Sequence, residues 1–375
     1  MHTTRNINII NYFIAFLPIS LIIGNLFTNI NIILICITGL LIFKKETFFL
    51  KNNKIFNYLL YLFFFYLISV TLFNNIPNLN NNTNINLTLY KENIFKSFFF
   101  LRFLLLFLVL SKLIEKNFLN LKLLVIVCSL SSFLIAFDII FQVIFKFNLI
   151  GLKISAYRPS SFFGSENIAG GYLQKFILFF IFYILIHNKN LKINFFYFSI
   201  LSSIFLIPII LTGNRMPAVI YILSIFTYLI LEKRLKEIIF ILCFFIFVVF
   251  LNIKNPFIER IDIQFKSFAE ETKIISLNIV KIFNKNKIKN DQNETLEIKS
   301  NYMLHFNSAI QIWKNNKLFG YGLKSFPLNC KYEKNQTCNT HPHNYFLEIL
   351  IDTGYIGVVL IYCLFFISLI IKTRL

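Results

Sequence analysis

The chain has 375 residues, of which 57% are hydrophobic, and a formal net charge of +20 at pH 7. The apolar residues, including 49 phenylalanines, lie in long unbroken runs, which excludes an ordinary soluble protein and predicts many transmembrane helices. The lysines and arginines lie mostly in short loops between these runs. Membrane topology explains that pattern better than nucleic-acid binding, so nucleic acid is not an expected partner.

We expect an all-α polytopic membrane protein with about 10–12 transmembrane helices, since a span needs about 20 apolar residues. Residues 1–253 are predicted to form transmembrane helices with short loops, 254–343 one large periplasmic loop region, and 344–375 the C-terminal transmembrane helix with its cytoplasmic tail. The predicted spans are residues 7–24, 29–43, 55–73, 94–111, 119–145, 171–186, 193–211, 216–231, 236–253 and 344–371.

The distribution of basic residues predicts the orientation. With the N-terminus inside, the inner loops hold lysine-rich clusters such as Lys44–Lys45 and Lys233–Arg234, while the short outer loops hold few basic residues. The positive-inside rule then places both termini in the cytoplasm. In a bacterium this is a multi-pass protein of the inner membrane, and its outer loops lie in the periplasm.

The outer segments differ in character. Residues 74–93 are rich in asparagine and predict a flexible surface loop, whereas residues 146–170 are too polar to span and rich in turn-forming residues. The large outer region predicts an amphipathic helix whose apolar face holds Tyr302, Phe306, Ala309, Ile310 and Trp313.

A glycine turn at residues 318–323 follows that helix, and then a polar loop contains Cys330 and Cys338. In an oxidising compartment these two cysteines can form a disulfide. The loop ends at residues 341–344, where the last apolar run begins.

Two arginines are predicted on the outer side. Arg215 lies in a very short connection between apolar runs, where it either snorkels at a helix end or, flanked by Gly213 and Pro217, marks a broken helix whose free amides bind an anion. Arg158 lies on the same side. Two planar guanidinium groups suit a pyrophosphate. Arg260 is a third outer arginine, for which a local ion pair with a neighbouring carboxylate is an adequate explanation.

His343 stands where the polar loop meets the last apolar run. Its imidazole titrates near neutral pH and can take a proton from a hydroxyl. His341 in the same His-Pro-His sequence suggests a metal site as an alternative, but no third histidine or carboxylate cluster completes a ligand set. Asn344 and Glu348 either orient the ring or the substrate, or cap the following helix.

These residues resemble the O-antigen ligase family of bacterial inner-membrane glycosyltransferases, which shares a signature with O-antigen polymerases and some protein O-oligosaccharyltransferases. Three stretches carry the resemblance. They are Arg158 to Gly171, the Thr-Gly-Asn-Arg turn ending at Arg215, and Phe319-Gly320-Tyr321-Gly322 leading through Cys330 and Cys338 to His341-Pro342-His343-Asn344, Glu348 and Gly354.

The resemblance implies transfer of a glycan from undecaprenyl pyrophosphate to a sugar hydroxyl of lipid A–core, on the periplasmic side, with no cofactor or metal. His343 is then the base that activates the acceptor hydroxyl, and Arg215 and Arg158 hold the leaving pyrophosphate. The positions assigned to substrate binding are Asn214, Arg260, Lys299, Asn344 and Glu348. Lys299 stands where the family tends to have an arginine, and Asn214 where it usually has a serine.

The alternatives differ in acceptor or in class. An O-antigen polymerase joins one lipid-linked repeat to another, and an oligosaccharyltransferase uses a protein hydroxyl. A polysaccharide or lipid transporter is an alternative from a different class. It generally needs more intramembrane ionisable groups than these apolar runs contain, of which Asp138 is the clearest.

Overall fold

A computed structural model describes residues 2–49, 54–79, 84–154, 158–164, 166–187, 191–231, 301–330, 338, 340–342 and 344–373. These ranges consist of helices and connecting turns without a strand, apart from a single antiparallel bridge between Phe147 and Lys153. The expected all-α fold is thereby confirmed. The chain forms two compact units: unit 1 contains Met1–Ile42 and Asn117–Ile274, and unit 2 contains Phe43–Lys116 and Ile275–Leu375.

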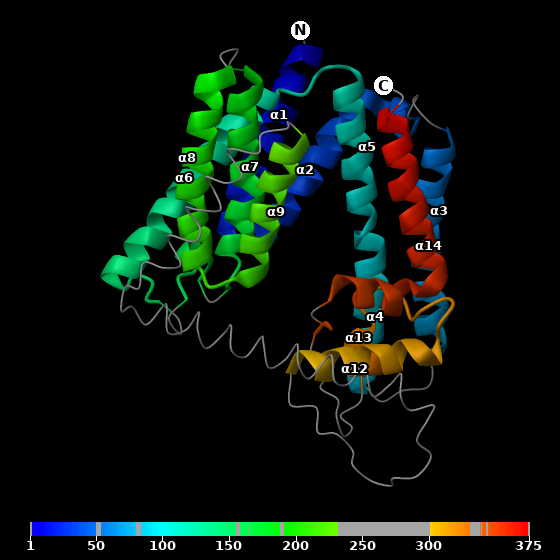
Figure 1. Ribbon diagram of the computed structural model, residues 1–375. Helices are drawn as coiled ribbons and strands as arrows, with labels where there is room; N and C mark the ends of the chain where they lie inside the picture. The colour runs from blue at the N-terminus through cyan, green and yellow to red at the C-terminus, as the bar shows by residue number, and fades with distance from the viewer. Residues whose placement is uncertain are drawn as a thin grey trace. The chain divides into compact units, whose positions relative to one another are not determined.

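Unit 1 is a bundle of apolar helices in which α6 packs against α1, α7 and α8, and α9 packs against α7 and α8 (Figure 1). Its core includes Ile135 and Ile139 of α6, and Leu173 and Ile177 of α7, all fully buried. The elements are α1 (His2–Ile23), α2 (Asn25–Phe43), α6 (Leu121–Phe145), the 3-10 turn η2 (Ser161–Phe163), α7 (Ala169–His187), α8 (Leu191–Leu211) and α9 (Arg215–Leu231).

Unit 2 packs α3 against both α4 and α14, and the short amphipathic helix α12 runs crosswise to α14 near its beginning (Figure 1). A small cluster of Ala309, Ile312, Phe326 and Ile351 joins α12, α13 and α14. The elements are η1 (Lys44–Phe48), α3 (Lys54–Leu79), α4 (Asn84–Phe99), α5 (Leu101–Glu115), α12 (Asn301–Asn315), α13 (Phe326–Asn329) and α14 (Tyr345–Thr373).

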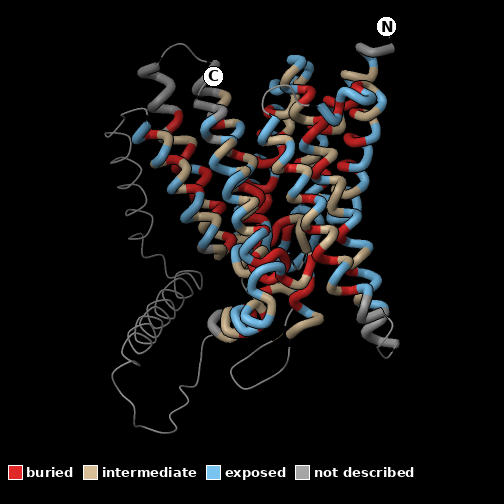
Figure 2. The backbone as a smooth tube through the Cα atoms, turned by 90° about the vertical axis from the view of Figure 1, so that its right-hand side faces the viewer, coloured by how far each residue is buried: buried red, intermediate tan, exposed pale blue. Residues whose placement is uncertain are grey.

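Six helices in the described ranges are long and apolar enough to cross a membrane, and three shorter ones, Ala169–Ile181, Ile200–Leu211 and Met216–Leu231, are also apolar. Each predicted span falls on one of these helices, except 236–253, which lies outside the described residues. Along the helices, buried residues alternate with exposed ones (Figure 2). The exposed residues include large apolar side chains such as Phe65 and Phe73 of α3, which are 71% and 80% exposed. Aromatic side chains in such positions face lipid in a multi-pass membrane protein.

The prediction of a flexible loop over residues 74–93 is wrong for its described part. Residues 74–79 continue α3 and residues 84–93 belong to α4. The asparagines hydrogen-bond within the helix, since Asn74 and Asn75 donate to carbonyl oxygens one turn back, those of Val70 and Thr71, at 2.9 and 2.7 Å.

The predicted amphipathic helix is present as α12. Ala309 is fully buried and Trp313 is half-buried, as expected, but Ile310 is exposed and Ile312 is buried instead. The buried stripe is therefore rotated slightly from the predicted one. Arg260 and Lys299, which were assigned to substrate binding, lie outside the described residues.

Candidate functional site

A buried polar network anchors the segment between α6 and α7. The carboxylate of Asp138, fully buried in α6, accepts hydrogen bonds from the backbone N–H of Leu149 at 2.8 Å and the hydroxyl of Ser161 at 2.6 Å. Gln142, one turn on, accepts from the Ser161 N–H at 2.9 Å, and Asn148 donates to the Ser161 carbonyl oxygen at 2.8 Å. The polar segment is thus tied to a membrane helix at several points.

This network gives Asp138 a structural role that the sequence did not reveal. Replacing Asp138 with alanine should leave the Leu149 N–H and the Ser161 hydroxyl without their acceptor. The expected loss of stability is about 2–3 kcal/mol, from the desolvation of unpaired buried groups. Asp138→Asn keeps one carbonyl oxygen and should lose less. Thermal unfolding of the purified protein checks this order; equal stability of Asp138→Ala and wild type would contradict it.

Arg158 lies within this anchored segment and against the turn between α8 and α9. A Cβ added to Gly213 would lie 3.7 Å from the Arg158 Cγ and 3.8 Å from its Nε. The Arg158 Nε is buried and has no hydrogen-bond partner among the described residues. The Arg158 Nε therefore lies at the turn and can donate a hydrogen bond to a bound group.

The turn itself is tightly built. Gly213 has φ +71°, a conformation that favours glycine, and a Cβ on Gly170 would lie only 2.4 Å from the Thr212 Oγ1, so the beginning of α7 packs closely on the turn. Asn214 donates to the Asn167 carbonyl oxygen at 2.5 Å. Two of the stretches that were singled out in the sequence, 158–171 and 212–215, therefore meet in space.

Arg215 is the first residue of α9, so its backbone stands where a helix begins with unpaired N–H groups and a partial positive charge. Its side chain lies outside the described part of the structure. The backbone alone favours an anion at this turn, in agreement with the broken-helix interpretation of the sequence.

In unit 2, the glycine turn packs directly on a break in α14. Gly354 interrupts the helix with φ 62° and ψ −167°, and a Cβ there would lie 2.3 Å from the Leu318 carbonyl oxygen. Backbone hydrogen bonds cross the junction: Tyr321 N to Ile351 O at 2.8 Å, Gly322 N to Asp352 O at 2.9 Å, Tyr355 N to Lys317 O at 3.0 Å and Ile356 N to Leu318 O at 3.2 Å. The loop thus satisfies backbone groups that the break in the helix releases.

Asp352 holds the next part of the same loop. Its buried carboxylate accepts from the backbone N–H of Lys324 at 3.0 Å, and from the N–H and hydroxyl of Ser325 at 3.3 and 3.2 Å. The Lys324 ammonium forms an ion pair with Glu348. The sequence analysis did not identify Asp352, although a carboxylate inside an apolar run was a signal. It interpreted Glu348 as a residue that orients the substrate or caps the helix, whereas the structure pairs its carboxylate with Lys324.

The beginning of α14 is capped by Asn344, whose side-chain oxygen accepts from the Leu347 N–H at 3.1 Å. Of the two roles considered for Asn344, the cap is therefore present. Just before it, Pro342 is buried, and the His341 Nδ1 lies 2.9 Å from the Thr340 hydroxyl. His343, the predicted base, lies outside the described residues, directly between Pro342 and the cap.

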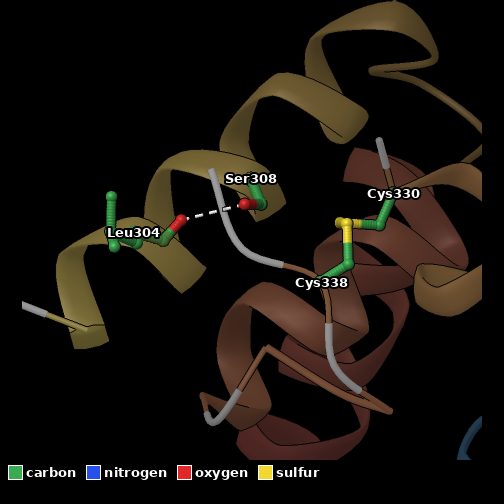
Figure 3. Close-up of a disulfide and its surroundings, with 4 residues drawn as sticks. All are labelled: Leu304, Ser308, Cys330 and Cys338. Carbon is green, nitrogen blue, oxygen red and sulfur yellow. Dashed lines mark hydrogen bonds between the residues drawn. A yellow bond between two sulfur atoms is a disulfide. The ribbon is translucent and has the colours of Figure 1, made fainter. Parts of the chain in front are cut away.

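A disulfide joins Cys330 and Cys338, so the predicted pairing is present (Figure 3). Cys330 directly follows α13 and packs against the cluster of α12, α13 and α14 residues around Ala309 and Phe326. The disulfide therefore ties the polar loop before His341 to this cluster.

Replacing Cys330 and Cys338 together with serine should destabilise unit 2 by about 2–3 kcal/mol, because the chain-entropy model assigns that amount to a short closed loop. We expect the melting temperature to drop. Alkylation of the reduced and unreduced wild type, read by mass spectrometry, checks the bond itself. Alkylation of both cysteines without a reductant would contradict the assignment.

The structure thus brings the predicted residues together in two groups. In unit 1, Arg158 lies against the turn that holds Asn214 and leads into Arg215. In unit 2, Asn344 and Glu348 lie at the beginning of α14, which follows the disulfide-bonded loop in the chain. No group of three or more His, Cys, Asp or Glu suited to a metal ion occurs in the described ranges. The meeting of the two groups in one site remains a prediction.

Comparison with known proteins supports two of the three stretches, the turn of Arg215 and the disulfide-bonded loop, whereas residues 158–171 lie outside the match. A family model described as O-antigen ligase matches residues 200–362, somewhat less than half of the chain. The match begins in α8, contains the Arg215 turn and the disulfide-bonded loop, and ends in α14. Neither the curated proteins nor the solved structures give a match.

Proposed function

We propose that this multi-pass membrane protein, whose residues 200–362 match a family model described as O-antigen ligase, transfers a glycan from undecaprenyl pyrophosphate to a sugar hydroxyl of lipid A–core. The family match supports an enzyme of the O-antigen ligase or polymerase type in general. One observation carries the finer proposal: the matched region contains both the turn of Arg215, against which Arg158 lies, and the loop of His343.

The proposed chemistry is a single displacement at the anomeric carbon of the donor. The bond from that carbon to the pyrophosphate oxygen breaks, and a bond to the acceptor oxygen forms. Arg158 and Arg215 stabilise the negative charge that develops on the departing undecaprenyl pyrophosphate, as fixed cations do for a transition state. Paired guanidinium groups suit the oxygens of two phosphates.

His343 serves as the general base in this scheme. It takes the proton of the acceptor hydroxyl as the new bond forms, and later releases it to water. Asn344 caps α14 and Pro342 is buried, so the two neighbours of His343 in the chain are both held by the fold. A base must be held within hydrogen-bond reach of the hydroxyl, so this rigid support favours the assignment.

We place the reaction on the periplasmic face of the inner membrane, with both termini in the cytoplasm. The excess of lysine in the predicted inner loops supports this orientation. The Cys330–Cys338 disulfide supports it independently, because disulfides persist in the periplasm and are rare in the cytosol.

Replacing Arg215 with lysine should remove most of the transfer activity, because the charge remains but the bidentate fork is lost. We expect kcat to fall at least about tenfold. Initial rates with purified lipid-linked glycan measure the effect, and Arg5→Lys, a change near the N-terminus in α1, is the matched control. Equal rates for Arg215→Lys and wild type would exclude a bidentate role.

Acceptor identity separates the proposed function from its alternatives. The purified protein is reconstituted in proteoliposomes with lipid-linked glycan and lipid A–core, and the products are separated by size. Conjugation to lipid A–core supports the ligase. Elongation of the lipid-linked glycan alone indicates a polymerase, glycan on protein an oligosaccharyltransferase, and translocation without transfer a transporter.

A further inference from the structure

Unit 1 contains a cavity of about 460 Å³ beside the turn between α8 and α9. Its walls are mainly apolar, formed by the end of α1, by Phe162 and Phe163 of η2, and by Tyr172 and Phe176 of α7. The polar lining residues are Asn25, Glu166, Asn167, Lys175 and Asn214. The cavity therefore combines a hydrocarbon-like surface with a few polar groups.

Lys175 is the feature that the proposed reaction does not use. It is the sole Lys, Arg, Asp or Glu in the sequence of α7, and it lies exposed in the second turn of this largely apolar helix. Its ammonium makes no hydrogen bond or ion pair with any residue in the described ranges. A lysine inside an apolar membrane helix is costly unless it faces a polar cavity or a partner. Here the side chain lines the cavity.

The carboxylate of Glu166 lines the same cavity without forming an ion pair with Lys175. The cavity thus presents one unneutralised cation, one carboxylate and the asparagine amides against apolar walls. An amphiphile with a hydrocarbon chain and an anionic head group matches this lining, because the chain covers the aromatic wall and the head group pairs with the ammonium.

Position relative to the arginines points to the kind of head group. Asn214 lines the cavity, and the neighbouring Gly213 is in contact range of Arg158. A phosphate bound by Lys175 would therefore lie at the same end of α7 as the proposed pyrophosphate site. A phosphate suits this position better than a carboxylate, because its several acceptor oxygens can pair with two neighbouring cations at once.

We propose that this cavity binds the phosphate-proximal end of a prenyl-phosphate lipid, with Lys175 as the cation that pairs with its phosphate. This inference rests on the proposed function, whose donor is such a lipid, and adds a binding residue and an apolar wall to its site. Lys175 contributes to holding the lipid in both the donor and the released product, whereas Arg158 and Arg215 act on the charge that develops during transfer.

Direct binding to the full-length protein in detergent tests the proposal without requiring transfer. The probes are undecaprenyl phosphate, uncharged undecaprenol and inorganic pyrophosphate. We expect Lys175→Gln to weaken undecaprenyl phosphate binding about tenfold, since a charge-assisted hydrogen bond is lost. Undecaprenol binding should not change. Lys153→Gln, which alters an exposed lysine outside the cavity lining, is the matched control and should bind as wild type.

The source of the anion is decided by the third probe. The lipid assignment would be overturned if inorganic pyrophosphate bound as tightly as undecaprenyl phosphate and Lys175→Gln weakened both equally. The prenyl chain would then contribute nothing to binding. Glu166→Gln removes the competing carboxylate and should strengthen undecaprenyl phosphate binding. Unchanged binding of undecaprenyl phosphate by Lys175→Gln would overturn the role of Lys175.

A second variant tests the cavity itself. A Cβ on Gly171 would meet only the Pro217 Cγ, at 4.0 Å, and both residues line the cavity. Gly171→Leu should therefore fold and fill the space, and we expect it to lose binding of both prenyl lipids. Gly171→Ala is the matched control and should keep most of it. Full lipid binding by a folded Gly171→Leu protein would contradict the proposed location.

The two proposals fail in different ways. If wild type binds undecaprenyl phosphate through Lys175 but transfers no glycan to any acceptor, the proposed function is wrong and the lipid pocket stands. If wild type transfers glycan while both Lys175→Gln and Gly171→Leu bind the lipid normally, the pocket is wrong and the function stands. His343→Ala should bind the lipid as wild type does, because the base contacts the acceptor.

Discussion

Replacing His343 with alanine will abolish glycan transfer while the protein still inserts into the membrane with its disulfide intact. The reason is chemical, because an acceptor hydroxyl is a weak nucleophile until a base removes its proton. Loss of a general base typically lowers the rate by about 10²–10⁴-fold. Transfer to lipid A–core is measured with reconstituted protein, and correct insertion is checked by the Cys330–Cys338 bond, which forms in an oxidising compartment.

His341→Ala is the matched control for this prediction. His341 lies two residues away on the same loop and contacts the Thr340 hydroxyl. Its loss should leave most of the activity, since we assign it no chemical step. Complete decoration of lipid A–core by the His343→Ala protein would refute the assignment of the base. Equal losses for both histidines would indicate a paired role for the two rings.

Replacing Gly354 with alanine will disrupt unit 2. The backbone there has φ 62°, which L residues other than glycine seldom adopt, and the new Cβ would lie 2.3 Å from the Leu318 carbonyl oxygen and 2.7 Å from the Gly320 N. Both contacts involve backbone atoms, so neither can yield by a rotamer change. We expect the variant to be poorly expressed and to lose several kcal/mol of stability, more than the ordinary range for point mutations.

Gly151→Ala is the control that measures the cost of a positive φ for alanine when the added Cβ meets no steric clash. Gly151 also has a positive φ of +90°, but nothing lies within 4 Å of an added Cβ. That change should cost only about 1 kcal/mol, the conformational part of the effect. Thermal unfolding of both variants in detergent makes the comparison. A Gly354→Ala protein as stable as Gly151→Ala would mean that the glycine turn does not pack on α14 as described.

Sequence reasoning predicted the elements that follow from local patterns. Long apolar runs predicted the membrane helices of the described ranges, and the periodicity of residues 302–313 predicted α12. Two cysteines in one polar loop were identified as able to form a disulfide, and the structure contains that bond. The short spacing of Gly213 and Pro217 around Arg215 correctly suggested that one helix ends and another begins there.

The parts that were missed depend on partners distant in sequence. Asp352 bonds to Lys324 and Ser325 across nearly thirty residues, and the Gly354 break inside an apolar run is stabilised by a loop that precedes it. The asparagines at 74 and 75 suggested a loop, but packing of α3 and hydrogen bonds along it prevailed over their low helix propensity.

The arginines of unit 1 and the histidine of unit 2 must meet for the proposed reaction to occur. Cysteine cross-linking in membranes tests this directly, with Cys363 changed to serine and a short bifunctional thiol reagent applied to the double variant Asn214→Cys, His341→Cys. The variant Asn167→Cys, Asn214→Cys, whose positions contact within unit 1, is the positive control. We predict that both pairs cross-link. Cross-linking of the control pair alone would show that the two units do not build one site.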